Sequence, residues 1–164
     1  MSKSTSVTSP PVDSSRTRDI QAEQVYRELL KTQQILSYDT GKMVESYGLS
    51  TQQFNLLRIL YVRRGEENGV LCQTIRKQLV HRDPDVSRLV ERMREKGMVT
   101  RERCPEDRRC TKVFLTDEGK TSCEEIGEAL KELLTDQFKH FDSDQMNTLE
   151  SLLVKVREPH TPGD

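Results

Sequence analysis

Apolar residues recur at helical spacing from Ile20 to Tyr47, at steps of four and seven positions. This stripe predicts one long amphipathic helix. A helix of about 28 residues is longer than a small monomer needs, because helices in globular proteins average about 10–14 residues. We therefore expect this helix to pack against a partner. The stripe is formed by Val25, Leu29, Leu36, Met43, Val44 and Tyr47.

The next element is delimited by capping residues. Gly48 can adopt the left-handed conformation that ends the long helix. Ser50, with Gln53 three positions later, predicts a capping box, in which each side chain accepts a hydrogen bond from the other residue's backbone N–H. Together they predict a second helix over residues 51–62. Its apolar face is formed by Phe54, Leu57 and Tyr61.

Two shorter helices are expected after a polar turn at residues 65–69. The third helix is indicated by apolar residues at intervals of four, namely Leu71, Ile75 and Leu79. Asp83 is expected to cap the fourth helix, with Pro84 in its first turn and Gly97 just after its end.

The fourth helix has one apolar face and one charged face. The apolar face is expected to point inward and consists of Val86, Leu89, Val90 and Met93. The charged face consists of Arg88, Glu91, Arg92 and Glu95. Because Arg88 and Arg92 lie one turn apart, both guanidinium groups can reach the same surface.

A β-hairpin is predicted by two short β-prone runs, residues 99–104 and 110–115, joined by a loop over 105–109. The loop ends in Asp107, Arg108 and Arg109, which puts two guanidinium groups at the tip of a turn. Two strands alone are only marginally stable, so we expect the hairpin to lean on the helices.

The last third of the chain predicts two more helices. Thr116 is expected to cap a long fifth helix, and the sixth is expected to start at about Asp142 or Ser143. The apolar stripe of the fifth helix is Ile126, Leu130, Leu133 and Leu134, with Phe138 near its end. The stripe of the sixth is Met146, Leu149, Leu152, Leu153 and Val156.

Composition favours one domain that shares its core with a partner. The 164 residues fit a single domain, but only 33% are apolar, none is Trp, and 32% are charged. Burial between subunits would relieve this shortage of core residues. Residues 1–18 are rich in Ser, Thr and Pro and are expected to form a flexible tail, residues 19–157 one domain, and residues 158–164 a second tail.

The chain shows no membrane-spanning run of about 18 apolar residues and no secretory leader over Met1 to Val12, so we expect a cytoplasmic protein without a membrane partner. Four scattered cysteines do not form a disulfide scaffold, and reduced thiols are expected. The histidines His81, His140 and His160 are far apart, and no Cys or His pair has zinc-site spacing. No metal site and no cofactor is expected.

Charge is distributed unevenly along the chain. The net charge is only −1, but residues 71–112 carry twelve Lys and Arg against seven Asp and Glu, a balance of +5. Residues 117–164 carry five against twelve, a balance of −7. The cations therefore gather where the hairpin and the fourth helix lie, which favours binding of duplex DNA there.

The candidate DNA contacts fall on the third and fourth helices and on the hairpin. Arg88 and Arg92 are expected to choose bases, because the arginine fork matches guanine edges. Phosphate contacts are expected from Arg76, Lys77, Arg82, Arg101 and Arg103. Asp85, Ser87, Arg108 and Arg109 complete the predicted contact set.

The order of these elements resembles the multiple-antibiotic-resistance regulator (MarR) family of bacterial winged-helix transcription factors, from about residue 20 to 157. Each matching segment alone is weak evidence for the resemblance, but their order and spacing together are specific. They are Gly48 to Phe54 with Leu56 and Leu57, Val86 to Met93, Lys96 to Val99, Arg103, Asp107 to Arg109, and Leu115 and Thr116 with Gly119.

The resemblance implies a mainly α fold with a small β-hairpin wing. A winged helix-turn-helix would span about residues 50–116, and dimerisation helices would span about 20–47 and 117–157. It also implies a homodimer that binds a near-palindromic operator, a repressor function, and release by a small-molecule effector that binds beside the dimerisation helices. Arg88 and Arg92 would then lie on the recognition helix, Arg109 would enter the minor groove, and Asp107 would orient the wing arginines.

Other interpretations stay open. Glu91 and Glu95 could pair with Arg88 and Arg92, leaving a merely solvated surface. The same helices could bind a protein and never touch DNA. Cys104 and Cys110 flank the hairpin loop, where a disulfide would make a redox switch. An enzyme is disfavoured, because the chain has no phosphate-binding glycine loop, no paired nucleophile and base, and no clustered carboxylates.

Overall fold

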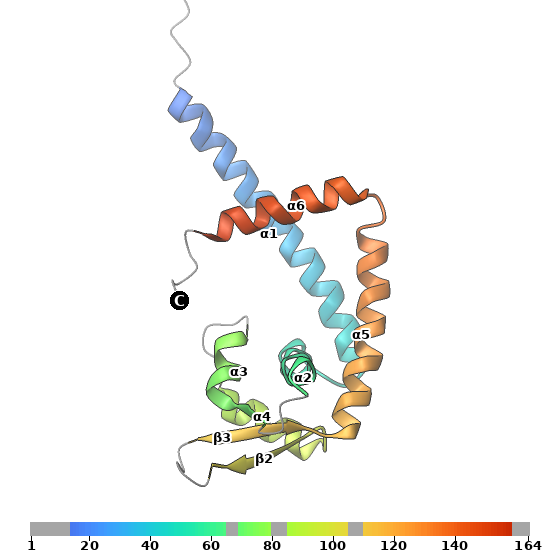
Figure 1. Cartoon of the computed structure of the whole chain (residues 1–164). Helices are drawn as coiled ribbons and strands as arrows, with labels where there is room; N and C mark the ends of the chain where they lie inside the picture. The colour runs from blue at the N-terminus through green and yellow to red at the C-terminus, as the bar shows by residue number, and fades with distance from the viewer. Residues whose placement is uncertain (1–13, 65–68, 80–84, 105–109, 159–164) are drawn as a thin grey trace, which may run out of the picture. The chain divides into compact units, whose positions relative to one another are not determined.

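The computed structural model describes residues 14–64, 69–79, 85–104 and 110–158, and residues 14–17 by their backbone only. The chain divides into two compact units, residues 1–39 and 40–164. Helix α1 (Ser14–Ser46) supplies the described part of the first unit and enters the second. Figure 1 labels the elements.

Helix α1 starts six residues earlier than expected, so the predicted flexible tail is wrong for residues 14–18. The prediction was based on the lack of large apolar side chains in this segment, but an existing helix can be extended without them, and the two Arg residues of the segment are good helix formers. An exposed pair between Glu23 and Arg27, one turn apart, adds a little support. Gly48 follows the helix with a φ of 73°, which confirms the glycine cap.

Helix α2 (Thr51–Val62) has the predicted bounds. The Gln53 N–H donates to Ser50 Oγ at 3.3 Å and the Ser50 N–H donates to Gln53 Oε1 at 2.9 Å, which confirms the capping box. The helix contacts α3, α4, α5 and strand β3, so its side chains lie at the centre of the core. The buried apolar residues of α2 are Phe54, Leu56, Leu57 and Leu60.

A short strand, β1 (Val70–Leu71), precedes helix α3 (Cys72–Gln78). The sequence analysis missed this strand and assigned Leu71 to the third helix. Two residues are too few to show alternation, and the strand exists only because β3 is there to pair with it, Val70 opposite Val113.

Helix α4 (Val86–Glu95) is capped by Asp85, whose carboxylate accepts the Arg88 backbone N–H at 3.1 Å. The predicted start with Asp83 as the cap is therefore wrong, although Asp83 and Pro84 themselves lie outside the described residues. Both aspartates suit a cap, and the choice is fixed by the core, because Val86 is buried and begins the helix.

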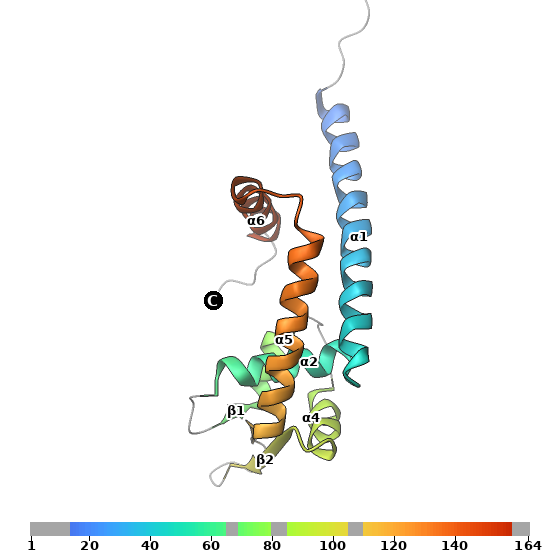
Figure 2. The same ribbon diagram turned by 90° about the vertical axis from the view of Figure 1, so that its right-hand side faces the viewer.

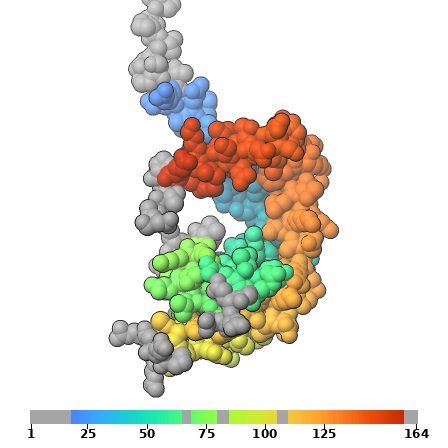
Figure 3. Space-filling model, viewed as in Figure 1, coloured from blue at the N-terminus to red at the C-terminus, as the bar shows by residue number. Residues whose placement is uncertain are grey.

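Strands β2 (Val99–Arg103) and β3 (Thr111–Leu115) form the predicted antiparallel hairpin, in register from Val99 opposite Leu115 to Arg103 opposite Thr111. With β1 they make a three-stranded sheet in the order β1-β3-β2. In Figure 3, α3 (green) and the hairpin (yellow) lie close together on one face.

Helix α5 (Asp117–Gln137) is capped as predicted by Thr116, whose Oγ1 accepts the Gly119 N–H at 3.0 Å. A Cβ at Gly119 would collide with the carbonyl oxygen of Met98, so only glycine permits this approach of α5 to the turn before β2. Helix α5 contacts α2, which it crosses in Figure 2.

Helix α6 (Ser143–Arg157) begins at the predicted position, with Asp142 and Gln145 forming a capping box. The helix has no buried residue. Its predicted stripe is half-buried at Leu149 and Leu153 and exposed at Leu152. In the parts of the chain that the structure describes, no helix combines the length and the apolar character needed to cross a bilayer.

Candidate nucleic-acid interface

Helix α4 separates its buried and exposed side chains almost as predicted. Val86, Leu89, Val90 and Met93 are buried in the core. Ser87, Arg88, Arg92 and Glu95 are exposed on the other side. Because four apolar anchors fix the rotation of the helix about its own axis, Arg88 and Arg92 are held on one outward face.

Arg88 is oriented from the start of the helix. Its Nε lies 3.0 Å from Asp85 Oδ2, while Asp85 Oδ1 accepts the Arg88 backbone N–H. Asp85, which the sequence placed among the DNA contacts, thus serves as the helix cap and as the partner of Arg88. An exposed ion pair contributes little stability, so a stronger acceptor could displace it and take the guanidinium.

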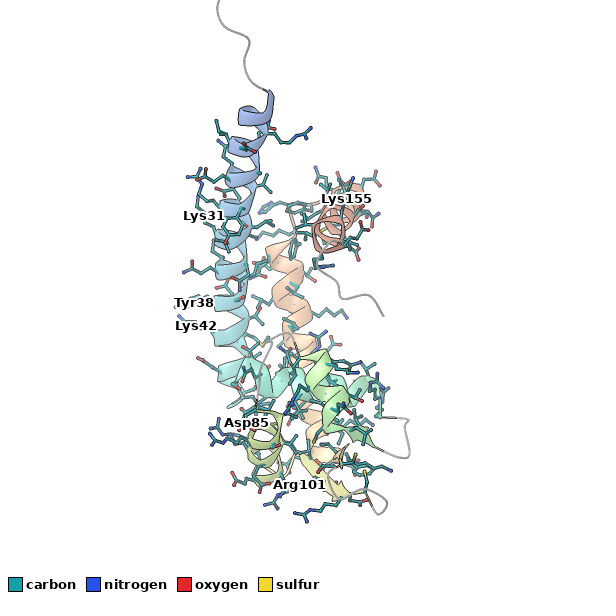
Figure 4. All side chains as sticks on the ribbon, turned by 90° about the vertical axis from the view of Figure 1, so that its left-hand side faces the viewer. Lys31, Tyr38, Lys42, Asp85, Arg101 and Lys155 are labelled. Atoms are coloured by element: carbon teal, nitrogen blue, oxygen red, sulfur yellow. The ribbon has the colours of Figure 1, made fainter. Side chains whose placement is uncertain are left out.

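Three further predicted contacts that the structure describes extend this surface. Arg76 and Lys77 are exposed in the last turn of α3, where they also complement the helix dipole. Arg103 is exposed at the end of β2. Figure 4 shows Asp85 on α4 and Arg101 on β2 beneath it. The two helices and the strand therefore bring these predicted contacts into one region.

Glu91 departs from the predicted pattern. Its Oε1 accepts hydrogen bonds from Arg94 Nη2 at 2.6 Å and Arg94 Nε at 3.0 Å, and its Oε2 lies 3.0 Å from Arg101 Nη2. The carboxylate therefore turns away from Arg88 and Arg92 and toward β2. Arg101, which the sequence assigned to phosphate contact, pairs with Glu91 in the structure, and its phosphate contact stays a prediction.

Sequence reasoning missed this cluster for a physical reason. The spacing of Glu91 and Arg94 is visible in the sequence, but Arg88 lies equally far away on the other side. Arg101, from another element, decides the direction, and only the folded structure brings it near. The hydrogen bond from Arg94 lowers the pKa of Glu91, against the effect of desolvation, and the charge of Arg101 lowers it further.

Four predicted site residues lie outside the described part of the chain. They are Arg82, Asp107, Arg108 and Arg109.

The two wing cysteines continue the hairpin ladder. The Cys104 N–H donates to the Cys110 carbonyl oxygen at 3.1 Å, so the residues lie opposite each other beyond the last β2–β3 pair. Opposed residues of this kind have Cα atoms about 5.5 Å apart, within the range of a disulfide. Both residues are half-buried thiols.

A pocket of about 500 Å³ lies between α2 and α5. On its wall the Tyr61 hydroxyl donates to Glu124 Oε1 at 2.8 Å, which raises the pKa of Tyr61. Arg58 lies 5.8 Å above the centre of the Phe54 ring. The pocket is lined by Phe54, Arg58, Tyr61, Val62, Cys123, Glu124, Gly127, Glu128 and Leu130.

In the described ranges, no three His, Cys, Asp or Glu side chains are grouped to hold a metal ion. The fold and the exposed arginines together define a winged helix-turn-helix protein. Residues 47–109 match the MarR family model. A MarR transcription factor from Planctomyces limnophilus is 30% identical, with a TM-score of 0.63, over 80% of this chain and 93% of that one. The chain belongs to the MarR family, whose members are transcription regulators and not enzymes.

Two further comparisons agree with this assignment. The chain is 26% identical over 110 residues to an uncharacterised HTH-type transcriptional regulator of Bacillus subtilis, YdgJ, covering 67% of this chain. The match spans 65% of that relative, just under two thirds of its length. The fold also matches mutant MarR from E. coli complexed with operator DNA, with a TM-score of 0.71 and 24% identity over 83% of this chain and 95% of that one.

Proposed function

We propose that this transcription regulator is a homodimer that binds a near-palindromic operator and represses the genes beside it. The observation that carries the proposal is the outward face of α4, where Arg88 and Arg92 stand over four buried anchors. The solved complex of the E. coli relative with operator DNA supports the same use of this fold.

The two contact classes have separate roles in this proposal. Arg88 and Arg92 select bases, because a bidentate arginine distinguishes guanine from the other bases. Arg76, Lys77 and Arg103, together with Arg82, contact phosphates and supply affinity that falls steeply with salt. Arg108 and Arg109 extend the contact into the minor groove, with Asp107 orienting them.

A second copy of the chain is needed to complete the site. The apolar side chains exposed on α1 and α6 would be covered by the partner, and symmetry would then repeat the α4 face about 34 Å away, one helical turn of DNA. A small-molecule effector would bind the pocket between α2 and α5, whose lining combines aromatic rings with polar groups.

Selection of bound duplexes from a random pool tests the operator, and a recovered palindrome also tests the dimer. In titrations with the selected duplex, Arg92→Ala and Arg109→Ala should each weaken binding by about 1–3 kcal/mol, and Arg92→Ala should relax the choice of one base pair. Lys155→Ala, an exposed cation on α6, is the control and should leave binding unchanged. A protein-interaction module would instead show no retention on a heparin column and little dependence of binding on salt.

Hydroperoxide control through Cys104 and Cys110 is a second candidate function, supported by their cross-strand register. A hydroperoxide would take two electrons from the two thiols, forming the disulfide and releasing water and an alcohol. The idea fails if a double Cys-to-Ser variant keeps the parent's DNA affinity and its response to peroxide.

A further inference from the structure

The Glu91 carboxylate joins α4, the proposed recognition helix, to strand β2 of the wing through an ion pair. One carboxylate oxygen takes both hydrogen bonds from Arg94 of the same helix, at 2.6 and 3.0 Å. The other oxygen lies 3.0 Å from Arg101, which comes from strand β2. The carboxylate thus ties α4 to β2 across ten positions of sequence.

This cluster differs from the other charged pairs of the described chain. The pairs of Lys31 with Glu28 and of Lys131 with Glu128 join neighbouring turns of one helix, and both partners are largely exposed. In contrast, the Glu91 side chain is only 32% exposed, and its Oε2 atom is buried and contacts Arg101 as an ion pair without a hydrogen bond. Exposed pairs are worth little, but a partly buried carboxylate shared by two guanidinium groups resists screening and fixes geometry.

The position of Arg101 gives the cluster its mechanical role. Arg101 stands opposite Val113, a buried residue of β3, so its side chain shares the sheet face that packs on the helices. Strand β2 carries Arg103 two residues further on and leads into the loop that ends at Arg109. A large rotation of the hairpin relative to α4 would therefore stretch or break the Glu91–Arg101 contact.

We propose that Glu91 is a positioning residue that holds α4 and β2 in the one relative orientation that lets helix and wing engage a single duplex together. The inference rests on the proposed DNA binding and deepens it. A carboxylate beside DNA repels phosphates, so its presence on the recognition helix lowers affinity for every sequence. However, its ion pair with Arg101 favours the complex in which α4 and the wing both contact the bases in register.

Two effects of removing this charge have opposite signs, which makes them separable. Loss of one negative charge strengthens nonspecific binding, because that binding depends on net electrostatics. Loss of the α4–β2 connection weakens only the specific complex, in which base contacts and wing contacts must form at once. The ratio of specific to nonspecific affinity therefore reports the positioning role and is insensitive to the change in charge.

The test is a set of anisotropy titrations of the full-length chain, with the selected duplex and with a scrambled duplex of equal length at one salt concentration. Glu95→Gln is the matched control, because Glu95 is an exposed carboxylate one turn away on the same helix. It should raise both affinities alike and leave the ratio within about twofold. Glu91→Gln should raise the affinity for the scrambled duplex and lower the ratio about tenfold or more.

Arg101→Gln approaches the same contact from β2 and keeps the test decisive if Glu91→Gln folds poorly in a thermal melt. We expect it to lower the ratio as Glu91→Gln does, and the double variant to lower it no further. If Arg101 contacts phosphate instead, both affinities fall together, the salt slope drops by about one and the ratio stays constant, which overturns the inference.

An unchanged ratio in Glu91→Gln also overturns the inference while leaving the proposed function intact. A parent protein that binds both duplexes equally, or neither, overturns the proposed function and this inference with it. The two failures are therefore distinguishable from the parent protein alone.

Discussion

The winged-helix region buries its large apolar side chains, whereas the terminal helices leave many side chains of the same kinds exposed. Within the winged helix, Phe54, Leu57 and Met93 are fully buried by other parts of the same chain. On the terminal helices, Ile35 of α1 is 61% exposed and Leu152 of α6 is 56% exposed. Because both regions have helical apolar stripes, the difference lies in what covers them.

The boundary between the two behaviours runs along α5. Its first half places Gly119, Cys123 and Ile126 in the winged-helix core. Its second half leaves Leu134 exposed. The winged helix therefore has a core that its own chain covers, whereas the terminal helices leave an apolar face that the proposed second copy would cover. Exposed apolar patches of this kind are typical of interfaces.

The largest expected effect comes from creating a cavity in the winged-helix core. Leu57→Ala should lower the free energy of unfolding by about 2–5 kcal/mol, because it removes a fully buried side chain and leaves a cavity. Urea titration followed by circular dichroism measures the loss. Val62→Ala, on the same helix but at an 81% exposed position, should change stability by less than about 0.5 kcal/mol. Equal losses in the two variants would remove the distinction between covered and uncovered stripes.

A charge on the exposed stripe should act on association rather than on folding. Leu152→Glu should raise the dimer dissociation constant about 10- to 100-fold, because it places an unpaired carboxylate in the proposed interface. Sedimentation at several protein concentrations measures it. Ser151→Glu adds the same charge next to Leu152 and serves as the control. A parent that is monomeric at every concentration would show that the exposed stripes have another explanation.

Local patterns predicted much of the fold, and they failed where a distant residue decides. The capping box of Ser50 and Gln53 spans three positions and was predicted with the helix that it begins. In contrast, β1 exists only because β3 lies beside it, and the cap of α4 is Asp85 because the core buries Val86. Each failure concerns a choice between local options of similar merit.

The candidate site follows the same rule. The exposed positions of Arg88 and Arg92 could be predicted, because the apolar face of α4 fixes the opposite one. The direction of Glu91 could not, because arginines stand three positions away on both sides and Arg101 of β2 selects between them. Amphipathic patterns thus determine which face carries the cations, while contacts between elements determine which cations remain available.

The smallest expected effect concerns Cys123, which lies in the half of α5 that packs in the winged-helix core. This thiol is 5% exposed, and burial raises its pKa from an ordinary value of 9.0 to about 11. The folded state therefore favours the neutral thiol. The stability that it contributes is fully present below pH 9 and is lost as the pH rises from about 9 to about 11.

Above pH 9 the parent should lose roughly 1 kcal/mol more per pH unit than Cys123→Ala, since one pKa unit corresponds to about 1.4 kcal/mol. Urea titrations of both proteins at pH 8, 9 and 10 measure this difference, and the comparison removes the contribution of Cys72, whose pKa is also raised. Iodoacetamide at pH 8 should label Cys104 before Cys123, because the thiolate is the nucleophile and Cys104 is the more accessible. Parallel pH profiles of the two proteins, together with equal labelling rates, would mean that the winged-helix core ends before Cys123, so that the first half of α5 belongs with the uncovered helices.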